Sequence, residues 1–181
     1  REFNQELLES YKPKIEQAKA NCLNLPRVKK FSRWLTEQRI SKYLESIESE
    51  LEYMDYRDPA NKRKIASREQ KISNIRAGVF TTKKELELTR EVNLGSPIDL
   101  PLLLYSKKGF NFPVIKYTKD KKTNRDTDKP STDEDTLVEL RLTVKDPESP
   151  KAIFLDNLLE LRGLKKMYTP SIQARPDKVQ E

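Results

Sequence analysis

Ile40–Met54, with the sequence ISKYLESIESELEYM, is the stretch that determines most of the predicted fold. Its apolar residues recur at spacings of four, three, four and three, which is the period of a coiled-coil seam. The seam residues are Ile40, Leu44, Ile47, Leu51 and Met54. Two heptads are fewer than the three or four that indicate a coiled coil by themselves. The stretch therefore predicts a long amphipathic helix over 27–58, whose seam packs either on other helices of this chain or on a partner chain.

Helices are also expected on both sides of this stretch. Residues 1–25 and 61–77 carry apolar side chains at intervals that place them on one helix face. Pro59 ends the central helix, and Gly78 provides a C-cap for the third helix. The third helix is too polar to be stable alone, so we expect it to lie across a neighbour. Residues 1–78 are therefore predicted to form a helical, coiled-coil-like segment.

The pattern changes in the second half of the chain. Thr82 and Glu85 have the spacing of a capping box, which predicts the start of a short helix. Strands are predicted at 102–105 and 112–118, with a turn between them. A third strand is predicted at 136–145, where apolar and polar residues alternate.

The remaining segments complete an α+β fold. Residues 119–135 contain no apolar side chain and are expected to form a flexible polar insert. A C-terminal helix is predicted over 151–167, and residues 169–181 are expected to form an extended tail. The chain is thus predicted to contain the helical segment 1–78 and a small strand-containing module with a C-terminal helix, 79–168.

Composition argues against most kinds of active site. The chain has no histidine, one cysteine and four scattered glycines. It therefore lacks the commonest general base, the ligands of a Cys/His zinc site and a glycine-rich phosphate loop. No apolar run approaches the roughly 20 residues of a membrane span. We expect a protein that is not an enzyme, without a cofactor, a metal or an evident small-molecule substrate.

Two basic clusters lie in the helical segment, where the charge excess is concentrated. Residues 1–77 contain 17 Lys and Arg against 12 Asp and Glu, a net charge of +5, and residues 78–181 contain 19 against 17, a net charge of +2. Such clusters either bind phosphates or are ordinary solvated helix faces. The first cluster is Arg27, Lys29, Lys30 and Arg33, beside Trp34, and the second is Lys62, Arg63, Lys64, Arg68 and Lys71.

These features favour an interaction protein. The charged fraction is 36%, against roughly 25% in ordinary globular chains. We therefore expect a thin core, with part of the apolar helix surface buried against other protein subunits. The leading hypothesis is a non-catalytic adaptor or scaffold subunit of a multiprotein complex. The alternative is a DNA- or RNA-binding protein that uses its basic helical surface.

The expected location follows from cysteine usage and general character. A single cysteine, Cys22, cannot form an internal disulfide, which fits a reducing compartment. In being lysine-rich and cysteine-poor, with helices followed by a small β-module, the chain is similar to subunits of eukaryotic nuclear assemblies such as chromatin or transcription complexes. That resemblance implies a nuclear location, with the cytoplasm as the alternative.

Overall fold

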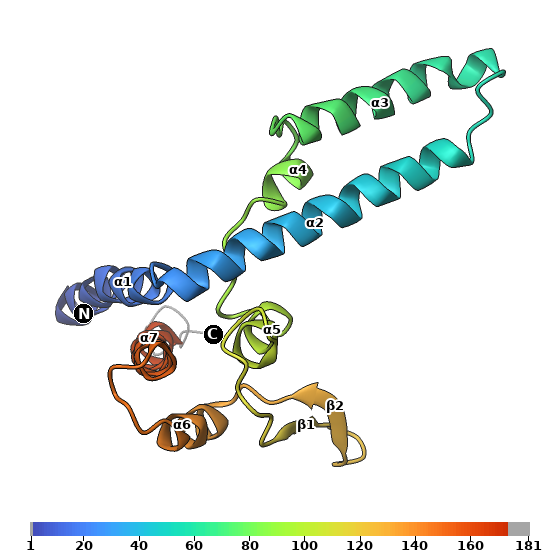
Figure 1. The fold of residues 1–181 in the computed structure, drawn as a ribbon. Coiled ribbons are helices and arrows are strands. Elements are labelled where there is room, and N and C mark those ends of the chain that lie inside the picture. Colours follow the sequence, from blue (N-terminus) through green and yellow to red (C-terminus); the bar gives the residue numbers. More distant parts are fainter. Residues whose placement is uncertain (1, 174–181) are drawn as a thin grey trace. The chain divides into compact units, whose positions relative to one another are not determined.

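A computed structural model describes residues 2–173 of the chain. Within these residues, helices dominate and a single two-stranded antiparallel sheet is present, so the fold class is α+β as predicted (Figure 1). The elements in chain order are α1 (Glu2–Leu23), α2 (Pro26–Glu52), the 3-10 helix η1 (Pro59–Asn61), α3 (Lys62–Arg76), α4 (Lys83–Glu87), α5 (Asp99–Tyr105), β1 (Tyr117–Lys119), β2 (Asp126–Pro130), α6 (Glu134–Thr143) and α7 (Pro150–Gln173).

The chain divides into two compact units. Unit 1 combines the two ends of the chain, Arg1–Phe31 and Asn93–Glu181, and unit 2 is the segment Ser32–Val92 between them. The domain boundary expected after residue 78 therefore falls inside unit 2, between α3 and α4. Unit 2 is an insertion in a discontinuous unit 1, an arrangement that sequence periodicity does not reveal.

Unit 1 contains the larger core. α7 packs along α1 and α6, and the rings of Phe110 and Phe154 stack with their centroids 4.5 Å apart. Cys22 is fully buried in unit 1, and desolvation raises the pKa of its thiol to about 12. The residues that bury their side chains in this unit include Val28, Phe31, Leu103, Leu104, Phe112, Leu137, Leu140, Leu155, Leu158 and Leu161.

Two of the predicted strands are helices. Residues 102–105 belong to α5, whose buried Leu100, Leu103 and Leu104 have helical spacing. Residues 136–143 belong to α6, because the Asp133 carboxylate caps the helix by accepting from the Thr136 backbone N–H at 2.8 Å. The alternation of apolar and polar residues over 136–145 therefore does not indicate a strand in this protein.

Other boundaries also differ from the predictions. Only Tyr117–Lys119 forms a strand in the region where 112–118 was expected to be one. The segment 119–135, expected to be a flexible insert, contains β2 and the cap of α6. α7 continues to Gln173, so the first residues of the expected tail 169–181 are helical, and the rest of that tail lies outside the described residues.

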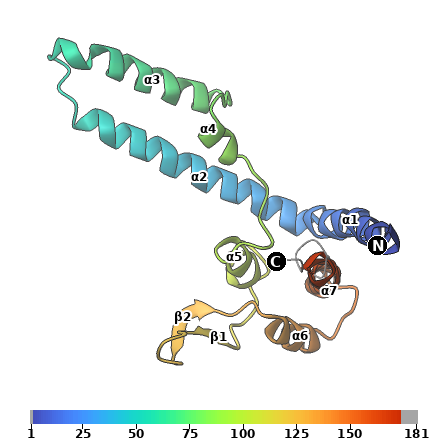
Figure 2. The same cartoon turned by 180° about the vertical axis from the view of Figure 1, so that it is seen from behind.

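Unit 2 is a helical hairpin, in which α3 runs back along α2 in both views (Figures 1 and 2). Ile47 and Leu51 of α2 pack with Ile65 and Ile72 of α3 in a small core. The predicted capping box of α4 is confirmed, because the Thr82 hydroxyl accepts from the Glu85 N–H and the Glu85 carboxylate accepts from the Thr82 N–H.

Candidate nucleic-acid interface

The predicted seam lies largely inside the helical hairpin of unit 2. Ile47 and Leu51 are buried by α3, and Leu44 and Met54 are half-buried against the same core. Ile40 is half-buried and is not part of that core. Of the two arrangements left open by the sequence, packing within the chain therefore accounts for most of the seam.

The first basic cluster lies on the initial turns of α2. Arg27, Lys29, Lys30 and Arg33 are all exposed, and the Arg27 guanidinium lies 5.5 Å from the centroid of the Phe110 ring. Trp34 is half-buried, so its indole is not freely available for stacking on a base. The two-unit division places Arg33 in unit 2 and the other three cations in unit 1.

The second basic cluster divides into a paired and an unpaired part. Arg68 is half-buried, and its Nε donates a hydrogen bond of 2.5 Å to the Glu50 carboxylate. This hydrogen bond lowers the pKa of Glu50, and the nearby charge of Lys71 lowers it further. Lys62, Arg63 and Lys64 are exposed and form no ion pair with any described residue. Lys71 is half-buried and no ion pair is described for it, so the fully exposed cations of the cluster are Lys62, Arg63 and Lys64.

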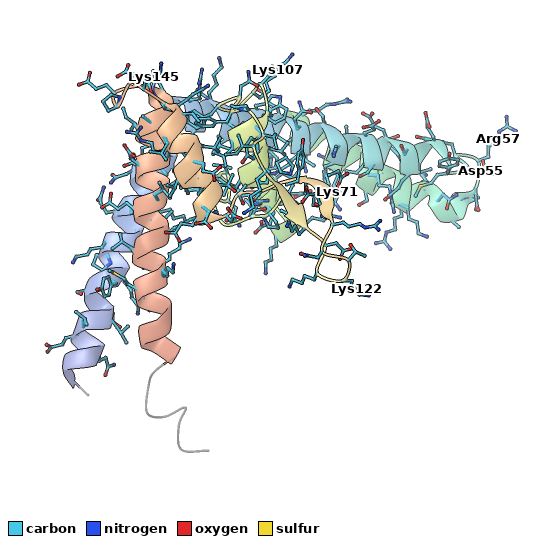
Figure 3. All side chains as sticks on the ribbon, turned by 90° about the horizontal axis from the view of Figure 1, so that it is seen from below. Asp55, Arg57, Lys71, Lys107, Lys122 and Lys145 are labelled. Atoms are coloured by element: carbon cyan, nitrogen blue, oxygen red, sulfur yellow. The ribbon has the colours of Figure 1, made fainter. Side chains whose placement is uncertain are left out.

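A third group of cations, which was not predicted from the sequence, lies on the β-hairpin. We call residues 116–130 the basic ribbon. β1 and β2 pair antiparallel, with Tyr117 opposite Pro130 and Lys119 opposite Asp126. Five exposed cations of the ribbon form no ion pair with a described residue (Figure 3 labels Lys122). They are Lys119, Lys121, Lys122, Arg125 and Lys129.

The turn of the ribbon has defined backbone geometry. The Asp120 N–H donates to the Arg125 carbonyl at 2.9 Å, and the Asn124 N–H donates to the Asp120 carbonyl at 2.8 Å. Asn124 adopts a φ of 55°, a left-handed conformation that asparagine tolerates better than most residues. The two lysines at the turn, Lys121 and Lys122, are therefore carried on an ordered loop.

The base of the ribbon is fastened to three helices of unit 1. The Tyr105 hydroxyl of α5 donates to the Ser131 carbonyl at 2.5 Å, and the Arg162 guanidinium of α7 donates to the Thr132 carbonyl at 2.5 Å. Lys116 forms an ion pair of 3.0 Å with Asp133, the cap of α6. The hydrogen bond from Thr136, with the smaller contribution of Lys116, holds the pKa of the Asp133 carboxyl well below its usual range.

The ribbon contributes nothing to the hydrophobic core. Every residue of β1 is exposed, and the residues of β2 are exposed or half-buried. An isolated two-stranded hairpin is marginal in water. An anchored hairpin that buries no apolar face is thus available for a role other than folding. A run of Lys and Arg in a segment without apolar residues was the sequence signal that could have identified it.

Neither a metal centre nor a membrane segment is found in the part of the chain that the structure describes. Residues 2–173 hold no cluster of three or more potential metal ligands. No helix there combines the length and hydropathy needed to cross a bilayer. Comparison of the chain with protein-family models, curated proteins and solved structures finds no match.

Proposed function

We propose that this chain is a non-catalytic nucleic-acid-binding element, which grips the phosphate backbone of DNA or RNA with the basic ribbon. The observation that carries the proposal is the ribbon itself, an anchored β-hairpin with five unpaired cations and no buried face. Lys and Arg bound to phosphates release condensed counterions, which favours binding at low salt. A two-stranded β-ribbon also has dimensions that fit the major groove of B-form DNA.

The distribution of charge favours attraction of nucleic acid by the ribbon rather than by the whole surface. The ribbon contains six Lys and Arg against three Asp, whereas the whole chain carries only +7. Its three aspartates, Asp120, Asp126 and Asp128, form no ion pair with the ribbon cations. A phosphate approaching the ribbon therefore meets a net charge of +3, carried mainly by cations that are not engaged in ion pairs.

Salt-dependent binding of a labelled DNA duplex tests this proposal. The measured quantity is the slope of log affinity against log salt concentration. Replacing Lys121, Lys122 and Arg125 with glutamine should make this slope less steep by about 3. The charge-matched control replaces three exposed lysines elsewhere in unit 1, Lys19, Lys145 and Lys165, with glutamine (Figure 3 labels Lys145). Equal losses in the two triple variants would show non-specific attraction and refute a role of the ribbon.

A second candidate function is the adaptor subunit of a larger nuclear assembly. It is favoured by apolar residues that remain exposed on α6, where Val138 is 42% and Leu142 78% exposed at a spacing of four. Such a pair can contact a helix of a partner protein. The test compares proteins that co-purify with the native chain and with Leu142→Glu. An identical partner set for both would remove this argument for the adaptor.

A further inference from the structure

The connection between α2 and α3 exposes two aromatic rings beside unpaired cations. We call residues 53–64 the helical tip. Tyr53 is 91% and Tyr56 61% exposed, the first being the most exposed large apolar side chain described. Large aromatic side chains are normally mostly buried. The two exposed tyrosines, three residues apart, add little to the core of this unit, so their rings are available for contact with a ligand.

The backbone of the helical tip is held by its own aspartates. The Asp55 carboxylate accepts from the Arg57 N–H at 2.9 Å, and the Asp58 carboxylate accepts from the Ala60 N–H at 3.0 Å. The Asn61 side chain donates to the Asp55 carbonyl at 3.2 Å. These bonds give the connection a defined course, so the tyrosines are presented on an ordered turn.

Charges of both signs lie near the two rings, and residues 53–64 carry four cations against two aspartates, a net charge of +2. Arg57 lies in the turn itself, where its side chain projects from the end of the unit (Figure 3). Lys62, Arg63 and Lys64 follow in the first turn of α3. All four cations are exposed and none forms an ion pair with a described residue. The first turn of α3 contains no acidic residue, and the two aspartates of the tip, Asp55 and Asp58, lie before it in the connection.

We propose that the helical tip binds single-stranded nucleic acid, with Tyr53 and Tyr56 stacking on bases and the cations contacting the adjacent phosphates. Unpaired bases expose their faces, whereas the bases of a duplex are already stacked on each other. Exposed rings combined with a basic surface are the pattern typical of single-strand binding without sequence preference. The inference rests on the proposed nucleic-acid function and adds a second site with a defined substrate class.

Fluorescence anisotropy of the full chain with a labelled 12-nucleotide oligothymidylate tests the inference. The double variant Tyr53→Ala/Tyr56→Ala should bind at least about ten-fold more weakly, because stacking on each ring is lost. Tyr53→Phe/Tyr56→Phe is the matched control and should retain the affinity, since the ring and not the hydroxyl stacks. Both positions are exposed, so neither variant is expected to impair folding.

Salt titration separates the rings from the cations. Replacing Lys62, Arg63 and Lys64 with glutamine should lower the magnitude of the salt slope for the oligothymidylate by about 2. The double alanine variant should weaken binding at every salt concentration without changing the slope. The same alanine variant should bind a labelled duplex as tightly as the unaltered chain.

The outcomes distinguish this inference from the proposed function. Unchanged oligothymidylate affinity in the double alanine variant would overturn the stacking site, even if the ribbon variant loses duplex binding. An equal loss of duplex and single-strand affinity in the alanine variant would overturn the assignment to single strands. If the unaltered chain binds neither nucleic acid at low salt, both proposals fail.

Discussion

A single carboxylate organises the start of α4. Glu85 is 2% exposed, and its side chain accepts hydrogen bonds from the backbone N–H groups of Thr81 and Thr82 and from the Thr81 hydroxyl. These bonds stabilise the ionised form and lower its pKa to about 2, against an ordinary value of 4.5. The charge of Glu85 is thus satisfied locally, without a cationic partner.

The low pKa of Glu85 predicts acid sensitivity in unit 2. A group with a lowered pKa in the folded state stabilises that state fully above its unfolded pKa of about 4.5, and the contribution disappears as the pH falls toward 2. The contribution is up to about 3 kcal/mol. Urea unfolding at pH 7 and pH 3, with Glu85→Gln as the comparison, should show a smaller pH effect in the variant. An equal pH effect in both proteins would contradict the assignment.

Replacement of two glycines by alanine should change the stability of the chain in opposite directions. At Gly109 a Cβ would lie 1.9 Å from the Leu103 carbonyl oxygen, which cannot move without disturbing α5. At Gly163, within α7, a Cβ would meet nothing within 4 Å. We expect Gly109→Ala to destabilise the chain by at least about 2 kcal/mol and Gly163→Ala to stabilise it by about 1 kcal/mol. Thermal unfolding of both variants tests the pair, and a loss of stability in Gly163→Ala would contradict it.

At the scale of elements, the basic ribbon depends on the helices at its base. Arg162 of α7 can be replaced with least change to the ribbon itself. The hydrogen bond described for its guanidinium is the one to the Thr132 carbonyl. Burial lowers the pKa of Arg162, but nearby Asp133 and Glu134 oppose this effect. The guanidinium therefore remains a charged donor at the ribbon base.

Replacing Arg162 with methionine should loosen the ribbon. One charge-assisted hydrogen bond is lost, at a cost of about 1.5–3 kcal/mol. The backbone amides of residues 117–130 should show larger-amplitude motion in ¹⁵N relaxation, and duplex affinity should fall although no phosphate-binding residue has changed. Lys166→Met is the control, since Lys166 pairs with Glu134 on α6 and does not contact the ribbon. Unchanged relaxation in the Arg162 variant would show that the other anchors suffice.

Some elements of the fold are encoded by local residue patterns, and others depend on contacts outside the segment. Helices at 27–58 and 61–77 were predicted because their apolar spacing is helical, and the capping box of Thr82 and Glu85 was found because its partners are local. The strand predicted at 136–145 was wrong, since the decisive contact is the side chain of Asp133, outside the alternating segment. Local patterns were reliable where capping and periodicity agreed.

The candidate sites were harder to predict for two physical reasons. The ribbon has no buried face, so its strands are defined by backbone hydrogen bonds and the turn from Asp120 to Arg125, which leave no hydrophobic pattern. The apolar seam of α2 was predicted from its spacing. Its burial by Ile65 and Ile72 was not, because it depends on how the chain folds back after Pro59. Exposure of Tyr53 and Tyr56 likewise depends on the position of that turn.

At the scale of the whole molecule, the chain leaves unit 1 and returns to it at neighbouring points. The Val92 N–H donates to the Ser32 side chain at 3.1 Å, and the Arg39 guanidinium donates to the Arg90 carbonyl at 2.9 Å. The two ends of unit 2 are thus within hydrogen-bonding distance of each other. An inserted segment whose ends meet can be removed without stretching the remaining chain.

Removing residues 33–91 and joining Ser32 to Val92 through a short Gly-Ser linker should leave unit 1 folded. The core side chains Cys22, Phe31, Phe110 and Phe154 all belong to unit 1. Unit 2 as a separate peptide should be only marginally stable, because its described core is small. Thiol labelling of Cys22 provides the measurement, since a buried thiol with a pKa of about 12 reacts only after unfolding. Protection of Cys22 in the shortened chain, lost in urea, is the expected result, and rapid labelling in buffer would show that unit 1 depends on its insertion.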